Sequence, residues 1–292
     1  EISPEDGETC DDGNQENETC PYGERNCVVC NSDCRLSPGS VTFCGDGIVN
    51  GDEFCDEPNN PQNCDDQCRP TNAFISIWRT TENNEQITLP LKEGFDYNFQ
   101  VNWGDGTVAQ ITEFNSPEKI HNYEFPGDYE ITIIGNLPAI SFHNQPERLK
   151  LYTVPNLGDT GWQDLAFAFS GCANLTYLSG GVLSSVTTLE NMFLDAVNVN
   201  PDAAEWDTSQ VTNMAGVFKN ASSANPDVQY WNTENVQTTA SMFEGASIAS
   251  PALGNCDTSN LIDASSMFKD APFADPDVRL WDVSSLENTA FM

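Results

Sequence analysis

The sequence has few positive charges. Only 11 of its 292 residues are Lys or Arg, against 45 Asp or Glu, which gives a formal net charge of −34. Binding to a nucleic-acid backbone or to an anionic membrane surface requires Lys and Arg, so this composition argues against both kinds of partner. It suits an exterior that repels its own copies or collects divalent cations.

Long apolar runs and catalytic motifs are also lacking. No run approaches the about 18 apolar residues that a membrane span needs, and the first residue, Glu1, opens directly into polar sequence. We therefore expect the numbering to start after processing or inside a longer chain. No G-x-S-x-G, H-E-x-x-H, P-loop or Rossmann pattern occurs, and the two histidines are His121 and His143. The sequence predicts a protein without enzymatic activity.

Cysteine is nearly absent from most of the chain and dense in one part. Nine of the 11 cysteines fall in the first 70 residues, while Cys172 and Cys256 stand alone. Because this stretch has few large apolar residues, we expect cross-links to replace a core, as in small secreted domains. The compartment is therefore predicted to be oxidising and extracellular. The expected disulfide cysteines are Cys10, Cys20, Cys27, Cys30, Cys34, Cys44, Cys55, Cys64 and Cys68.

Residues 1–70 are predicted to form a disulfide-rich module of two units. The first unit reads GETCDDGNQENETCPYGERNCVVCNSDC and the second reads CGDGIVNGDEFCDEPNNPQNCDDQC. This pattern resembles the Myxococcus-type cysteine-rich repeat of bacterial surface proteins. The first unit has five cysteines and lacks the CGDG lead-in, so we expect one unpaired cysteine there, Cys10. Spacing alone does not give the connectivity.

Metal binding is an alternative for both kinds of cluster in this module. Cys27-x-x-Cys30 with Cys34 has a spacing that zinc sites use, but the lack of a nearby histidine and the secreted context favour disulfides. The Asp and Asn clusters resemble loops that bind hard cations, although turns prefer the same residues and no full EF-hand register is present. The candidate calcium ligands are Asp11, Asp12, Asp46, Asp52 and Asp56.

Residues 71–140 change to an alternating texture. The segments FISIW, DYNFQVNW and YEITIIG have the length and alternation of strands and are separated by Gly and Pro turn signals, which predicts a small antiparallel β-sandwich. WGDGT, from Trp103, and HNYEFPGDYEITIIG, from His121, resemble the polycystic-kidney-disease (PKD) domain. We expect Asp105 to hydrogen-bond the turn backbone rather than to catalyse, and His121 to be a packed strand residue.

Residues 141–292 carry a repeat. WDTSQVTNMAGVFKNA, from Trp206, returns as WNTENVQTTASMFEGA and as CDTSNLIDASSMFKDA. A fixed period with recurring apolar positions predicts a solenoid, because one unit cannot bury its apolar face until the next copy stacks on it. The predicted core columns, each with a 25-residue period, are Trp206, Trp231, Cys256 and Trp281, and Phe193, Phe218, Phe243 and Phe268.

Thr, Ser, Asn, Val and Pro dominate each coil, which disfavours helix and predicts one short parallel strand near the Val-x-x-Met stretch. QVTNMAGVFKNASSANPDVQYWNTE, from Gln210, resembles the BspA-like leucine-rich repeat family, the surface protein 26-residue repeat. The resemblance implies an extracellular, often adhesive, bacterial surface protein. It departs from the family in having Pro before the Asp, and Cys256 in place of Trp. The sequence stops in mid-repeat at Met292, so we expect association at an uncapped end.

The sequence as a whole predicts a mainly β, multidomain surface protein whose solenoid binds a protein or a glycan on a rigid stalk. Two alternatives stay open: a subunit of an extracellular filament or surface layer, and the non-catalytic arm of a larger secreted hydrolase. Cys172 and Cys256 are expected to be buried, unreactive thiols. The candidate contact residues are Gln210, Thr212, Asn213, Gln237 and Thr238.

Overall fold

The computed structural model describes residues 10, 20, 26–39, 43–46, 48, 55, 56, 64, 65 and 68–292. The chain divides into two compact units, Glu1–Thr71 and Asn72–Met292. Within the described residues, helix is confined to two short 3-10 segments, η2 (Pro117–Lys119) and η3 (Pro146–Leu149), and neither could cross a membrane. The expectation of a mainly β protein is confirmed.

The first unit contains a short hairpin. Strand β1 (Val28–Cys30) pairs antiparallel with β2 (Leu36–Pro38). In the turn between them, the side-chain Oδ1 of Asn31 accepts the backbone N–H of Asp33 at 3.1 Å and of Arg35 at 2.9 Å. Such local side-chain to backbone bonds stabilise a turn without a hydrophobic core.

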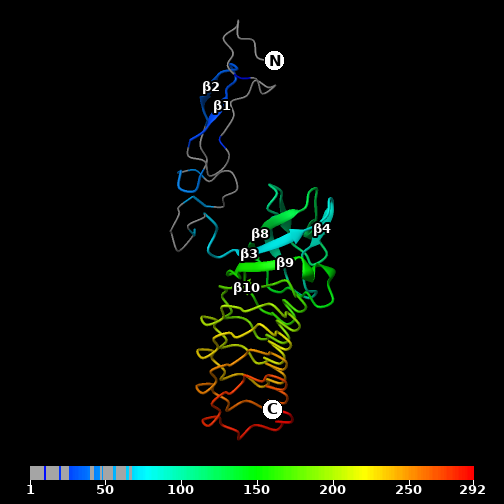
Figure 1. Ribbon diagram of the computed structural model, residues 1–292, viewed down its shortest axis with the longest axis vertical. Coiled ribbons are helices and arrows are strands. Elements are labelled where there is room, and N and C mark those ends of the chain that lie inside the picture. Colours follow the sequence, from blue (N-terminus) through cyan, green and yellow to red (C-terminus); the bar gives the residue numbers. More distant parts are fainter. Residues whose placement is uncertain are drawn as a thin grey trace. The chain divides into compact units, whose positions relative to one another are not determined.

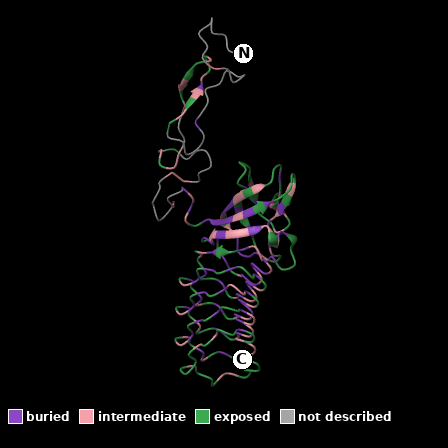
Figure 2. Ribbon diagram, viewed as in Figure 1, coloured by how far each residue is buried: buried purple, intermediate pink, exposed green. Residues whose placement is uncertain are grey.

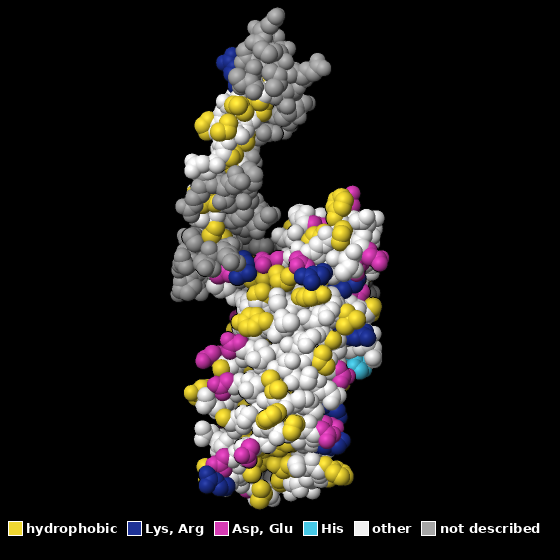
Figure 3. All heavy atoms as spheres, in the orientation of Figure 1, with side chains coloured by type: hydrophobic (Ala, Val, Ile, Leu, Met, Phe, Trp, Pro, Cys, Tyr) yellow, Lys and Arg dark blue, Asp and Glu magenta, His cyan; other side chains and the backbone are white. Residues whose placement is uncertain are grey.

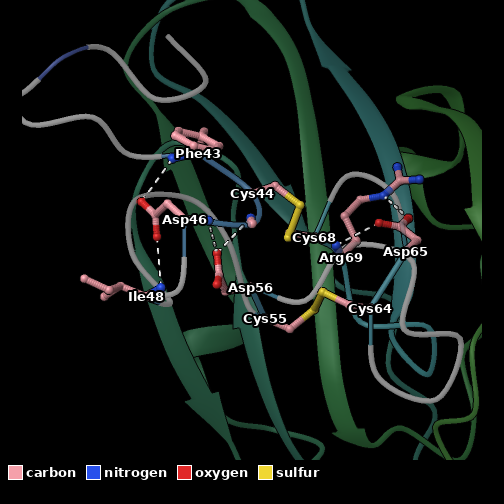
Figure 4. Close-up of a disulfide and its surroundings, with 11 residues drawn as sticks. Phe43, Cys44, Asp46, Ile48, Cys55, Asp56, Cys64, Asp65, Cys68 and Arg69 are labelled. Atoms are coloured by element: carbon pink, nitrogen blue, oxygen red, sulfur yellow. Dashed lines mark hydrogen bonds and ion pairs between the residues drawn. A yellow bond between two sulfur atoms is a disulfide. The ribbon is translucent and has the colours of Figure 1, made fainter. Parts of the chain in front are cut away.

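Four disulfides cross-link this unit in two nested pairs. In the first pair, Cys10–Cys30 encloses Cys20–Cys27. In the second pair, Cys44–Cys68 encloses Cys55–Cys64 (Figure 4). Each half of the segment thus repeats one connectivity. The expectation that Cys10 is unpaired was wrong, because the path of the chain decides which thiols meet. The zinc alternative is also excluded, since Cys27 and Cys30 are both in disulfides.

The second unit begins with a six-stranded sheet in the order β10-β9-β3-β8-β5-β6, of which Figure 1 labels β10, β9, β3 and β8. Its strands are β3 (Phe74–Thr80), β5 (Asn98–Asn102), β6 (Val108–Ile111), β8 (Gly127–Asn136), β9 (Leu151–Asn156) and β10 (Tyr177–Leu178). The three segments predicted as strands are β3, β5 and β8, so these predictions are confirmed. β3 lies between β8 and β9, antiparallel to both, and Arg79 is its one exposed residue.

A second, two-stranded sheet packs into the same core. It consists of β4 (Glu85–Thr88) and β7 (Ile120–Tyr123), which pair antiparallel. Their inward residues Ile87 and Tyr123 are fully buried and belong to one apolar cluster with Phe99 of the larger sheet. The buried Tyr123 hydroxyl donates to the carbonyl of Trp103 at 2.8 Å, which satisfies its polar atom.

After β9 the chain winds into stacked coils that follow the 25-residue period (Figure 1). One residue per coil forms an isolated parallel bridge with the next coil, and the bridge residues are Ala139, Asp164, Thr188, Asn213, Thr238, Asp263 and Asn288. The prediction of a short parallel strand is right in place and wrong in length. Asn213 lies in the Val-x-x-Met stretch, but the chain turns from Ala215, so the ladder is one residue wide there.

The sheet and the coils form one compact unit. β9 and β10 come from the segment predicted as the third domain, yet they complete the sheet that contains β3. Buried residues continue from the sheet into the interior of the coils (Figure 2). The boundary predicted at 140/141 therefore falls inside this unit. The residue pattern changes there from alternation to the repeat, whereas the buried core continues across it. The boundary predicted at 70/71 lies one residue from the division at 71/72.

Candidate functional site

The repeated phenylalanines form a column through the coils. Neighbouring ring centroids are 5.7, 5.6, 5.3 and 6.0 Å apart along Phe169, Phe193, Phe218, Phe243 and Phe268. The column extends to Phe142, whose ring lies 6.3 Å from Phe169 and 5.5 Å from Trp78 of β3. Burying each such ring contributes about 1.5–3 kcal/mol. The aromatic core of the sheet thus continues into the coils and fixes their direction of stacking.

The repeated tryptophans form a second, interrupted column. Trp206 and Trp231 stack with centroids 6.0 Å apart. Each indole N–H donates to a backbone carbonyl of an earlier coil, in the pairs Trp206 with Gly180 (2.9 Å), Trp231 with Ala203 (2.8 Å) and Trp281 with Leu253 (3.1 Å). The structure therefore brings Trp206 and Trp231 together as predicted from the period, and Cys256 separates Trp231 from Trp281.

The triplet Trp-Asp-Thr returns with one change in each later coil, as WNT, CDT and WDV, and each of its positions has a separate structural contact. Asp207 accepts the backbone N–H of Ser209 at 3.0 Å, and its hydrogen bonds with Ser209 lower its pKa. The hydroxyl of Thr208 donates to the carbonyl of Asn232 in the next coil at 2.9 Å. The equivalent bonds are Thr233 to Asp257 (2.8 Å) and Thr258 to Asp282 (3.1 Å). These polar residues therefore stabilise turns and join coils.

Two positions in each coil adopt the left-handed backbone region, with φ between 52° and 70°. They are occupied by Asn191, Gly216, Ser241 and Ser266, and by Asp195, Asn220, Gly245 and Asp270. Gly, Asn and Asp tolerate this conformation better than other residues, and they occupy the second position throughout, whereas the first position also accepts Ser and Phe. The recurrence of Gly, Asn and Asp at the second position was visible in the sequence, and the sequence analysis missed it.

Two lysines hold Glu244 on the outside of the coils. Lys219 Nζ lies 2.7 Å from one carboxylate oxygen and Lys269 Nζ lies 3.1 Å from the other. The hydrogen bond from Lys219, with further bonds from Ser241 and Lys269, lowers the pKa of Glu244 to about 2. Three successive coils are thus joined by alternating charges.

A row of exposed side chains runs along the coils next to the bridge residues. The backbone N–H of each residue in the row donates to the carbonyl of the equivalent residue in the coil before. The four bonds, from Thr212, Gln237, Ile262 and Glu287, are 2.9, 2.9, 2.8 and 2.8 Å long. We call the side chains of this row the ladder face: Thr187, Thr212, Gln237, Ile262 and Glu287, all exposed. Their chemistry changes from coil to coil while the backbone beneath them is continuous. This arrangement gives a rigid support with a variable surface.

The predicted contact residues divide between this surface and the turns beneath it. Gln210, Thr212 and Gln237 are exposed. Asn213 and Thr238 are half-buried, and each accepts the backbone N–H two residues later, at 2.9 and 3.2 Å. On the face drawn in Figure 3, uncharged side chains and backbone cover most of the coil surface.

The two isolated thiols differ in accessibility. Cys172 is fully buried, and burial raises its pKa, as expected for an unreactive thiol. Cys256 is only half-buried, which corrects the expectation that it is buried, although desolvation still raises its pKa. The difference arises because Cys172 replaces a small alanine of the repeat, whereas Cys256 replaces an indole and leaves space beside it.

The candidate calcium ligands that the structure describes are used in turns. Asp46 accepts the backbone N–H groups of Phe43 at 3.3 Å and Ile48 at 2.9 Å. Asp56 accepts those of Gly45 at 2.8 Å and Asp46 at 2.9 Å (Figure 4). Asp11, Asp12 and Asp52 lie outside the described residues. Calcium binding stays a prediction, and the contacts of Asp46 and Asp56 match the alternative that turns prefer aspartate.

The pair Asp105 and His121 has the structural roles predicted for it. Asp105 accepts the backbone N–H of Thr107 at 3.0 Å, which closes the tight turn. His121 lies in β7, stacks on Trp103 with centroids 4.9 Å apart, and has Nε2 2.7 Å from Asp105. The bonds from Thr107 and His121 lower the pKa of Asp105 against the opposing effect of desolvation. The carboxylate therefore fixes the turn against β7.

Fold and surface together define a mainly β protein with a disulfide-rich unit and a stack of 25-residue coils. The family model described as "Mycoplasma protein of unknown function, DUF285" matches residues 163–281 and 249–292. The chain is therefore similar to that family over the stacked coils. No curated protein and no solved structure matches the chain.

Proposed function

We propose that this chain belongs to a secreted, bacterial-type cell-surface protein that binds a protein or a glycan through its stacked coils. The observation that carries the proposal is the ladder face, in which five exposed side chains of differing chemistry stand on one hydrogen-bonded ladder. Stacked repeats bind over extended surfaces of this kind rather than in deep pockets. The proposed function is binding without catalysis.

The same proposal assigns a family to each part of the chain. The coils are a BspA-like leucine-rich-repeat solenoid, which the DUF285 match and the stacked Phe column support. The sheets are a PKD-like β-sandwich, supported by the Asp105 turn and its contact with His121. The first unit is a pair of Myxococcus-type cysteine-rich repeats, supported by the repeated nested disulfides. These disulfides also support an oxidising, extracellular location, where this unit acts as a stalk.

Binding to arrays of extracellular proteins and glycans tests the proposal. The test variant carries Thr212→Lys and Gln237→Lys on the ladder face. Its matched control carries Tyr230→Lys and Asn255→Lys, which are also exposed, one per coil, and add the same charge. We expect the ladder-face variant to lose binding at least tenfold, because two long cations replace uncharged side chains in the middle of this surface, and the control to bind as the unchanged chain does.

Equal losses in the two variants would remove the ladder face as the contact surface. If the chain binds no protein or glycan on the arrays and instead forms polymers in size-exclusion chromatography and negative-stain images, the filament alternative is favoured. Binding that requires an attached catalytic domain would favour the arm of a secreted hydrolase.

A further inference from the structure

The tryptophan column lacks one ring. Trp231 and Trp281 stand two repeats apart, and Cys256 occupies the equivalent position between them. A thiol fills much less space than an indole, and a cavity of about 30 Å³ remains at this level. Its walls include Trp231, Trp281, Met242 and Met267.

The walls of this cavity offer little to water. Three threonines and Asp257 line it. Asp257 accepts the backbone N–H of Ser259 at 2.9 Å, and each threonine hydroxyl is already engaged. Thr233 and Thr258 donate to carbonyls of the next coil at 2.8 and 3.1 Å, and Thr239 contacts the sulfur of Met267 at 3.3 Å. A buried water needs two to four polar partners, and apolar cavities without them stay dry and bind apolar molecules.

One backbone carbonyl at the cavity has capacity for another donor. Ala203 O and Leu253 O each accept two bonds, from the amide of their own coil and from an indole of the next. The equivalent atom at the missing ring is Val228 O, and Val228 lines the cavity. Within residues 68–292, all of which the structure describes, it accepts one bond, from Trp231 N at 3.2 Å. The second bond would come from the indole that Cys256 replaces.

The cavity is smaller than an aromatic ligand, and its walls can move. An engineered cavity that binds benzene has a volume of about 150 Å³. Met242 and Met267 are unbranched and adapt to filled space at low cost. Cys256 lines the cavity and is only half-buried, so the wall on this side is not completely covered by other side chains. A flat ring can therefore enter at the thiol and displace methionine side chains.

We propose that this cavity binds a small planar aromatic molecule with a ring N–H group, of the indole class. The bound ring completes the column between Trp231 and Trp281 and donates its N–H to Val228 O. Trp206 and Trp231 show the spacing for this arrangement, 6.0 Å between centroids. The site is interior to the coils and distinct from the ladder face, so it goes beyond the function proposed above.

Calorimetry and thermal unfolding of the full chain with indole test the proposal. Indole should bind saturably and raise the melting temperature. Indene has the same shape with CH₂ in place of N–H, and it should bind about threefold to tenfold more weakly, as expected for one lost hydrogen bond. Cys256→Trp supplies the missing ring covalently, so this variant should bind indole at least tenfold more weakly. Cys172→Ala changes the other isolated thiol and should bind indole unchanged.

Cys256→Ala keeps the test decisive if the tryptophan variant fails to fold. It enlarges the cavity and should bind indole as tightly as the unchanged chain, or more tightly. Methyl NMR signals of Met242 and Met267 should shift with indole, while those of distant methyl groups stay in place. Absence of saturable binding by the unchanged chain, or equal binding by folded Cys256→Trp, would overturn the proposal.

Discussion

The described residues of the disulfide-rich unit and the stacked coils both lack long strands and helices, and the two regions are stabilised in different ways. In the first unit, Val28 and Leu36 of the hairpin are 67% and 57% exposed, so apolar burial contributes little there. In the coils, Phe193, Phe218 and Phe243 are fully buried. Covalent bonds restrict the unfolded chain in one region, whereas contacts between neighbouring coils stabilise the other. Irregular backbone is thus stabilised by cross-links in one region and by stacked side chains in the other.

Reduction of the disulfides should produce the largest difference between the two regions. Loss of one native disulfide from a small domain costs about 2–5 kcal/mol, so a reductant should unfold residues 1–71 and leave residues 72–292 folded. Limited proteolysis of the full chain, with the fragments identified by mass, measures this. Cys44→Ala with Cys68→Ala should reproduce part of the effect, and Cys172→Ala should not. Equal proteolysis of the two regions in reductant would contradict the comparison.

Phe218→Ala should destabilise the coils strongly. Removal of a buried phenylalanine costs about 3–5 kcal/mol, and Phe218 stacks on a ring on each side. Phe268→Ala is the matched control, since Phe268 is only half-buried and should cost less. Urea unfolding followed by tryptophan fluorescence reports both values. If both variants lose the same free energy of unfolding, burial within the phenylalanine column does not stabilise the coils as its geometry indicates.

Gly158→Ala should weaken the connection between the sheet and the coils. Gly158 has a φ of +71°, and an added Cβ would lie 2.4 Å from the backbone of Ala73. The left-handed conformation alone costs a residue with Cβ about 1–2 kcal/mol, and the clash adds to it. Gly106→Ala, with a φ of +85° and open space around it, should show the conformational cost alone. Thermal unfolding distinguishes them, and a smaller effect at Gly158 would count against close packing there.

The coils should become less stable at pH values below the ordinary pKa of glutamate because of Glu244. Its pKa is lowered in the folded chain from 4.5 to about 2, so the stabilisation is present above pH 4.5 and is lost as the pH falls toward 2. The group is near the surface, and we expect only about 0.5–1 kcal/mol. Glu244→Gln should remove this part of the pH dependence in urea unfolding, and Glu234→Gln, at an exposed position, should leave it.

Calcium chelation should have the smallest effect. Asp46 and Asp56 use carboxylate oxygens to hold turn N–H groups, so we expect EDTA to leave the melting temperature of the chain unchanged. Differential scanning calorimetry with EDTA, and with EDTA plus excess calcium, measures this. If EDTA lowers the melting temperature and excess calcium restores it, the Asp clusters are calcium ligands, and calcium stabilises the first unit in addition to its disulfides.

Sequence reasoning succeeded where a residue's neighbours are set by spacing. The 25-residue period places Phe193 against Phe218 and Trp206 against Trp231, since equal steps along a repeated chain bring equal positions together. The roles of Asp105 and His121 were also predictable, because a tight turn and an adjacent strand determine them locally.

Prediction from the sequence failed where distant segments choose their partners. Nothing in the spacing says that Cys10 bonds Cys30, or that β9 joins the sheet beside β3. The cavity at Cys256 combines both cases: the sequence shows the missing ring, but only the packing shows that space and a backbone acceptor remain.

The sequence by itself determined that one end of the chain is cross-linked and that the other stacks like on like, because cysteine density and a fixed period act through composition and local repetition. The tertiary structure alone decided which thiols pair, where the sheet ends and which polar side chains are left exposed. All three depend on contacts between segments far apart in the chain, and the free energy of such a contact depends on both segments rather than on either one alone.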